Sequence, residues 1–188
     1  MFLARLFRRS PHKDEALALY GAAVRQARQP AFYADCGVPD SVDGRFDLIV
    51  VHVFLVIRSL TRAGEAGERT GQTLLEIMFD DMDQNLREMG VGDLSVGKKV
   101  KVMARAFYGR SKAYTEALEP VAEVSALEAA LGRNIYGRET PRAGQIAALA
   151  GYVRAADAAL AAQPAEAVLA GRISFPAAPT PDAPPSSD

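Results

Sequence analysis

The chain has 188 residues, which is the size of one ordinary domain and excludes several independent cores. Hydrophobic residues make up 49% and charged residues 24%, a globular composition rather than a fibrous one. There is no tryptophan and only 7% of residues are aromatic, so an aliphatic, helical core is favoured over a sheet. One cysteine and two histidines exclude a disulfide framework and argue against a metal centre built on these residues. We therefore expect a reducing compartment, no metal and no cofactor.

The formal charge of −1 hides an uneven distribution. Residues 1–13 hold four basic and no acidic side chains, and residues 94–115 hold six basic and no acidic ones. Two basic segments on an otherwise acidic chain indicate contact with an anionic partner, such as RNA phosphates or lipid headgroups. The longest apolar run, residues 48–57, is too short for a membrane span of about 20 residues, so we expect a soluble protein.

In chain order, the first helix is expected to begin at Ser10 and Pro11, which suit an N-cap and a first turn, and to end near Pro30. Turn-forming residues make 31–44 a predicted loop. The breaker-free segment 45–62 is predicted to be a buried helix. Its core face would carry Phe46, Val50, Val53 and Ile57, with Arg45, His52 and Ser59 roughly opposite.

After a polar, glycine-containing connection at 63–71, a third helix is predicted over about 72–89, with Gly90 at its C-terminus. Its inward side chains would be Leu75, Met78, Met82, Leu86 and Met89. A fourth helix would be capped by Ser95 and would present two opposite faces. The apolar face holds Val96, Val100, Met103, Phe107, Tyr114 and Leu118, and the cationic face holds Lys98, Lys101, Arg105 and Lys112.

Further helices are predicted over about 124–136 and from Thr140 and Pro141 towards Gln163, followed by a short piece at 166–171. Five prolines in the last thirteen residues predict a disordered tail. The expected architecture is an all-α, single compact domain of about six to seven helices. It comprises a basic N-terminal arm (1–13), a helical domain (14–170) and a proline-rich tail (176–188).

The residues suggest no catalytic constellation, because phosphate-binding glycine loops and Glu-x-x-His pairs are absent from the sequence. Asp80, Asp83 and Arg87 share a helix side, which favours a solvated face with an i,i+4 ion pair and leaves an acidic partner-docking surface as the alternative. His52 is interpreted as a structural histidine that hydrogen-bonds another element, and Cys36 as an incidental thiol. A small helical enzyme using Asp80, Asp83 or His52 is the least favoured hypothesis.

Three segments resemble the ubiquinol–cytochrome c chaperone family, assembly factors of respiratory complex III. They are Pro30–Asp47 followed by the apolar helix, Phe79–Ser95 and Ala106–Arg110. The resemblance continues more loosely to about residue 160 and includes Arg133–Tyr136, whereas Gly97 stands where the family pattern has proline. It implies a non-enzymatic helical chaperone that binds newly synthesised cytochrome b.

The same resemblance implies partners and sites. The partners would be cytochrome b, the ribosome exit region, a small helper protein and an anionic membrane surface. The location would be the cytoplasm, at the cytoplasmic face of a bacterial inner membrane. Candidate client-binding residues are Phe32, Tyr33, Val38, Pro39, Asp40, Asp43, Gly44, Arg45, Asp80, Asp83, Arg87, Gly90 and Asp93. Candidate ribosome- or lipid-binding residues are Lys98, Lys99, Lys101, Arg105 and Lys112. A peripheral ribosome- or lipid-binding module without a client is the alternative function.

Overall fold

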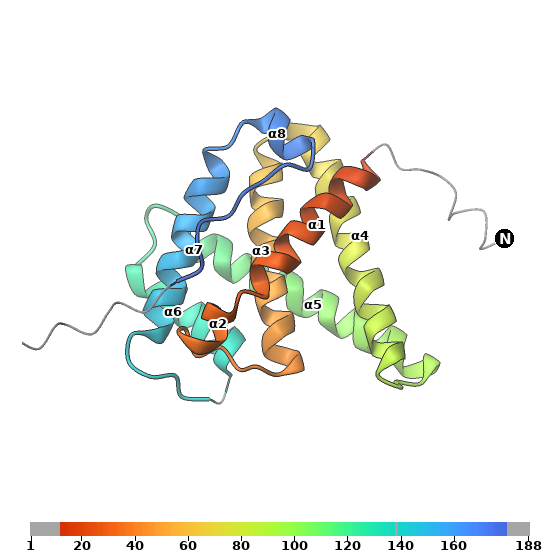
Figure 1. Ribbon diagram of the computed structural model, residues 1–188, viewed down its shortest axis with the longest axis horizontal. Coiled ribbons are helices and arrows are strands. Elements are labelled where there is room, and N and C mark those ends of the chain that lie inside the picture. Colours follow the sequence, from red (N-terminus) through yellow and green to blue (C-terminus); the bar gives the residue numbers. More distant parts are fainter. Residues whose placement is uncertain (1–11, 138, 180–188) are drawn as a thin grey trace, which may run out of the picture.

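The computed structural model describes residues 12–137 and 139–179. Over these residues the chain forms α-helices and one π-helical turn and contains no strand, which confirms the predicted all-α class (Figure 1). Of the helices in this part of the chain, α2 and α8 are five-residue turns and the others have eight residues or more. The elements are α1 (Lys13–Ala27), α2 (Pro30–Ala34), α3 (Val42–Thr61), α4 (Gly64–Glu88), α5 (Asp93–Ala117), α6 (Val124–Leu131), the π turn η2 (Gly132–Tyr136), α7 (Gln145–Ala161) and α8 (Ala165–Leu169).

Helix α3 is the centre of the fold and is surrounded by other elements (Figure 1). It contacts α1, α4, α5, α7, α8 and η2. Thirteen of its 20 residues are buried, more than the single stripe that an amphipathic surface helix hides. The expectation that His52 and Ser59 lie away from the core is therefore wrong, because α7 covers that side of the helix.

The interpretation of His52 as structural is confirmed. Its Nδ1–H donates to the Leu48 carbonyl at 2.7 Å, and its Nε2 accepts from the Tyr152 hydroxyl of α7 at 2.9 Å. The rings of Phe32 and Phe175 pack edge-on against the imidazole, each with its centroid 5.3 Å away. Burial lowers the pKa of His52 to about 4, so this ring is neutral at physiological pH.

The chain beyond α8 runs along the body and seals this aromatic cluster. Phe175 lies against His52, and the Gln26 side chain of α1 donates to the Pro176 carbonyl at 3.0 Å. Ala178 also packs against the core. Pro176 and Ala178, in the segment predicted to be a disordered tail, thus contact the domain, whereas residues 180–188 lie outside the described residues.

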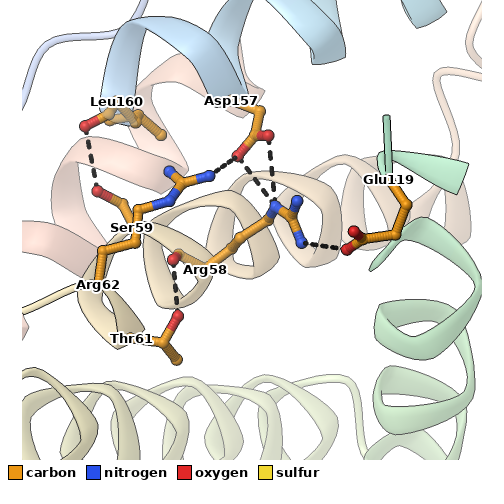
Figure 2. A network of polar contacts seen from close by, with 7 residues as sticks. All are labelled: Arg58, Ser59, Thr61, Arg62, Glu119, Asp157 and Leu160. Carbon is orange, nitrogen blue, oxygen red and sulfur yellow. Dashed lines mark hydrogen bonds and ion pairs between the residues drawn. The ribbon is translucent and has the colours of Figure 1, made fainter. Parts of the chain in front are cut away.

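A polar network fastens α7 onto α3 (Figure 2). Arg58 Nε lies 3.2 and 3.3 Å from the two carboxylate oxygens of Asp157, and Arg62 Nη2 lies 3.2 Å from one of them. Arg58 also approaches Glu119, beyond the end of α5, at 3.8 Å, and the Ser59 hydroxyl donates to the Leu160 carbonyl at 3.2 Å. Because the Asp157 carboxylate is only 15% exposed, its two arginine partners offset the cost of removing its charge from water.

Several predicted boundaries are wrong. The loop at 31–44 contains α2 and ends earlier, because the Ser41 hydroxyl accepts from the Gly44 N–H at 3.1 Å and caps α3. Helix α5 begins at Asp93 with Gly92 as its N-cap, not Ser95, and α7 begins at Gln145 rather than at Thr140. The expected cap of the first helix, Ser10 and Pro11, lies outside the described residues, as does most of the arm 1–13.

The expected connection at 63–71 is also wrong, since α4 starts at Gly64. A Cβ built on Gly67 would lie 1.9 Å from the carbonyl oxygen of Leu60. The glycine therefore lets the first turn of α4 pack directly on the backbone of α3. Close packing between these helices outweighs the low helix propensity of glycine.

We expect Gly67→Ala to destabilise the protein by about 1–3 kcal/mol, because the methyl group forces α4 away from α3. The matched control is Gly151→Ala on α7, where an added Cβ meets no atom within 4 Å and where alanine stabilises an exposed helix by about 0.5–1 kcal/mol. Denaturant unfolding of both variants measures this. Equal stability of the two variants would contradict the close approach.

Candidate functional site

A cleft of about 940 Å³ opens where α3 begins and α4 ends. Its other walls are α5 between Lys98 and Arg110 and the turn η2. The apolar side chains that line it are Val42, Phe46, Met82, Leu86, Met89, Val102, Met103, Ala106 and Ile135. Val42, Met89 and Val102 are 63%, 60% and 63% exposed. Leu86 and Met89 were expected in the core, and the structure places them in this open cleft instead.

The cleft is open because α4 and α5, the two longest of the described helices, extend past the core. Figure 1 shows the lower ends of α3 and α4 diverging, with α5 returning from the turn at the far end of α4. Arg87 holds that turn through ion pairs with Asp83, at 2.6 Å, and with Asp93. Gly90, at φ +80°, permits the reversal. These four candidate residues shape the frame of the cleft without lining it.

A largely buried ion pair between α3 and α5 lies in the wall of the cleft. Asp47 Oδ1 lies 2.5 Å from Arg110 Nη1, and the two side chains are 10% and 20% exposed. Burial raises the pKa of Asp47 to about 6 and outweighs the opposing attraction of Arg110. Sequence reasoning did not select either residue. The available signal was a lone acid at the edge of an apolar run, together with an arginine in an acid-free segment.

The candidate client-binding residues separate into distinct locations. Pro39, Asp43 and Gly44 line the cleft. A Cβ on Gly44 would lie 2.1 Å from the Pro39 carbonyl oxygen, so this glycine lets the preceding loop pass against α3. Phe32 and Val38 are 0% and 2% exposed, so the core holds them and their side chains offer no surface to a client.

Tyr33, Asp40 and Arg45 lie in a separate hollow of about 600 Å³ beside Arg28. Arg45 Nε donates to Asp40 at 2.6 Å, and the Tyr33 hydroxyl donates to the Ala27 carbonyl at 3.0 Å. Asp40 and Arg45 therefore neutralise each other, while Arg28 adds a positive charge to the hollow. Asp80 is exposed on α4 and lies in neither hollow.

The candidate cations of α5 divide between two surfaces. Lys98 and Lys99 line the cleft, while Lys101, Arg105 and Lys112 are exposed and lie outside it. The apolar face of α5 behaves differently along its length. Val96, Phe107 and Tyr114 are buried as expected, whereas Val100 and Met103 are only partly covered.

The groups with reactive potential are held in unreactive states. The Cys36 side chain is fully buried, and burial raises its thiol pKa to about 11. His52 is neutral and both ring nitrogens are engaged.

The i,i+4 pair of Asp83 and Arg87 is confirmed. Within residues 12–137 and 139–179, no three His, Cys, Asp or Glu side chains group as metal ligands would. None of the described helices has the length and apolar composition of a membrane span.

Comparison with known proteins identifies relatives of this chain. The sequence profile described as ubiquinol-cytochrome C chaperone matches residues 34–175. Ubiquinol-cytochrome-c reductase complex assembly factor 1 of Xenopus laevis is 25% identical over 142 residues, which cover 76% of this chain and 70% of that protein. The Mus musculus protein is 26% identical over 142 residues, but these cover only 48% of its length. The crystal structure of the Cbp3 homolog from Brucella abortus matches with a TM-score of 0.81 and 35% identity, over 97% of this chain and 100% of that one.

As the pH falls from 7 to 5, we expect the free energy of unfolding of Asp47→Asn to decrease by about 1 kcal/mol relative to that of the wild type. The pKa of Asp47 in the folded protein, about 6, is above its ordinary 3.8, so Asp47 binds a proton on folding and adds stability as the pH falls through 6. The pKa of His52, about 4, is below its ordinary 6.5, so His52 removes stability as the pH falls below 6.5. The variant retains only the second effect.

Denaturant unfolding of both proteins across this pH range measures the difference. Parallel stability curves for the variant and the wild type would show that Asp47 does not carry a raised pKa.

Proposed function

The chain belongs to the ubiquinol–cytochrome c chaperone family, and we propose that it is a non-enzymatic assembly chaperone that binds newly synthesised cytochrome b. The curated relatives are named as assembly factors of the ubiquinol-cytochrome c reductase complex, which supports a role in building that complex. The chain spans about half the length of the two mammalian relatives, so the proposal concerns the part that they share.

The open apolar cleft is the observation that carries this proposal. Val42, Met89 and Val102 stand more than half exposed around one hollow, although side chains of this kind gain free energy when another apolar surface covers them. Met82, Met89 and Met103 are among the apolar lining residues, and their flexible thioether chains adapt to irregular partners. Such a cleft suits an apolar segment of a client protein.

The size of the exposed apolar surface suits transient binding. Complete burial of a valine or methionine side chain contributes about 1.5–3 kcal/mol, and these three are already partly covered. Association also costs several kcal/mol in lost freedom of motion. The cleft is therefore expected to hold its client weakly enough to release it to the assembling complex.

The unreactive states of Cys36 and His52 support action by binding rather than by catalysis. A protonated, buried thiol is a poor nucleophile, and a fully engaged neutral imidazole cannot reach a substrate. Asp47 and Arg110, two largely buried charged residues in the lining of the cleft, already pair with each other. They would stabilise the shape of the cleft and leave its apolar walls to contact the client.

The double variant Val42→Asp/Met89→Gln tests the proposal in cells that lack the gene. We expect it to fail to restore assembled complex III and to lose cytochrome b in crosslinked pulldowns, because it places a charge and an amide on the apolar walls. Cytochrome b messenger should remain normal. Val42 is the first residue of α3, so an aspartate there is compatible with the helix dipole.

The matched control is Val124→Asp/Leu17→Gln. Val124 is likewise the first residue of a helix and is 76% exposed, and Leu17 is 45% exposed on α1, both outside the cleft. This variant should restore complex III. If both double variants restore it fully, the cleft is not the client site, and unchanged complex III in the deletion strain itself would refute the assembly role.

A second function, contact with the ribosome or with anionic lipid at the cytoplasmic face of the inner membrane, is favoured by the cations of α5. Lys101, Arg105 and Lys112 are exposed and lie outside the cleft, so they can contact a partner other than the client. If this contact were the whole function, cleft variants would restore complex III and variants of these cations would not.

A further inference from the structure

The outer face of α5 carries a continuous stripe of exposed side chains. Positions 94, 98, 101, 105, 108 and 112 follow the alternating four- and three-residue spacing that keeps side chains on one side of a helix. At 100° per residue they fall within an arc of about 80° and extend over about 27 Å. The members of this α5 stripe are Leu94, Lys98, Lys101, Arg105, Tyr108 and Lys112, and all are exposed.

The α5 stripe combines positive charge with exposed apolar surface. Leu94 is 92% exposed and Tyr108 is 57% exposed, and between them lie Lys98, Lys101 and Arg105. Within residues 94–115 the sequence contains no acid, whereas the rest of the chain carries a net negative charge. The stripe is thus a cationic surface with two apolar side chains that are more than half exposed.

This combination distinguishes between two anionic partners. RNA phosphates bind the lysines and the arginine, but an isolated, exposed leucine adds no binding free energy to such a contact. At the interface of a bilayer, the charged and the apolar side chains both add binding free energy. The cations bind anionic headgroups, while leucine and tyrosine enter the boundary of the acyl chains. We propose that the α5 stripe docks the protein on the surface of an anionic lipid bilayer.

The charges around the α5 stripe are compatible with this role. Arg87 neutralises Asp93 at the start of α5. Glu116 lies 3.9 Å from Lys112 and reduces the positive charge only at the far end. Lys98 both belongs to the stripe and lines the cleft, so a protein docked in this way presents the cleft beside the membrane surface. This inference rests on the second function proposed above for the cations of α5, which it narrows to lipid, and it does not depend on the identity of the client.

Vesicle cosedimentation of the full chain tests the charges. We expect binding to phosphatidylglycerol-containing vesicles, weak binding to pure phosphatidylcholine vesicles, and weaker binding in salt. Lys101→Gln/Arg105→Gln should lower the partition coefficient about 25-fold, since each cation near the surface contributes about fivefold, or about 1 kcal/mol. The control Arg25→Gln/Arg28→Gln removes two exposed cations from the α1 region and should retain more of the binding. Equal losses in both variants would overturn the proposal.

Tryptophan fluorescence tests insertion, because the chain has no tryptophan of its own. In Tyr108→Trp, anionic vesicles should shift the emission to shorter wavelength, whereas in Leu17→Trp, on α1, they should not. Leu94→Ser should weaken vesicle binding and leave any ribosome binding unchanged. The proposal fails if Tyr108→Trp shows no shift, or if purified ribosomes bind the stripe while anionic vesicles do not.

Discussion

The fold depends on burying α3 on every side. A helix with only one apolar face needs a single partner, but α3 carries apolar side chains around most of its circumference and is covered by α1, α4, α5, α7 and α8. Even the polar groups on its far side, His52 and Ser59, are matched by Tyr152 and Leu160 of α7. The other helices are placed by the need to enclose it.

This enclosure stops at the N-terminal end of α3, and the cleft is the result. There α4 and α5 continue beyond the core, and their facing apolar side chains have no described element between them. Asp47 and Arg110 pair at this boundary, where burial is already strong enough to raise the pKa of the carboxyl group. The cleft and the α5 stripe lie on adjoining sides of one helix and share Lys98. One helix therefore serves both proposed contacts, with a client and with a membrane.

The helical class and the structural role of His52 could be predicted from the sequence, because apolar periodicity and the absence of partners for catalysis are local properties. The openness of the cleft could not. The period of Leu86, Met89 and Met103 shows which helix face is apolar, but only the packing of distant elements decides whether that face is covered. The same limit applies to Gly67. Its close approach to Leu60 of α3 could not be seen in the sequence, so the segment 63–71 was expected to be a connection although most of it is helix. Asp47 and Arg110 gain their role only when α3 and α5 meet.

We propose that this helical bundle binds another polypeptide in its open apolar cleft. Site-specific photo-crosslinking in living cells tests it most directly, with benzoylphenylalanine introduced at position 89 inside the cleft and at position 17 on α1. The account predicts crosslinks to cytochrome b from position 89 and not from position 17. Crosslinks to cytochrome b from both positions alike, or from neither, would contradict it.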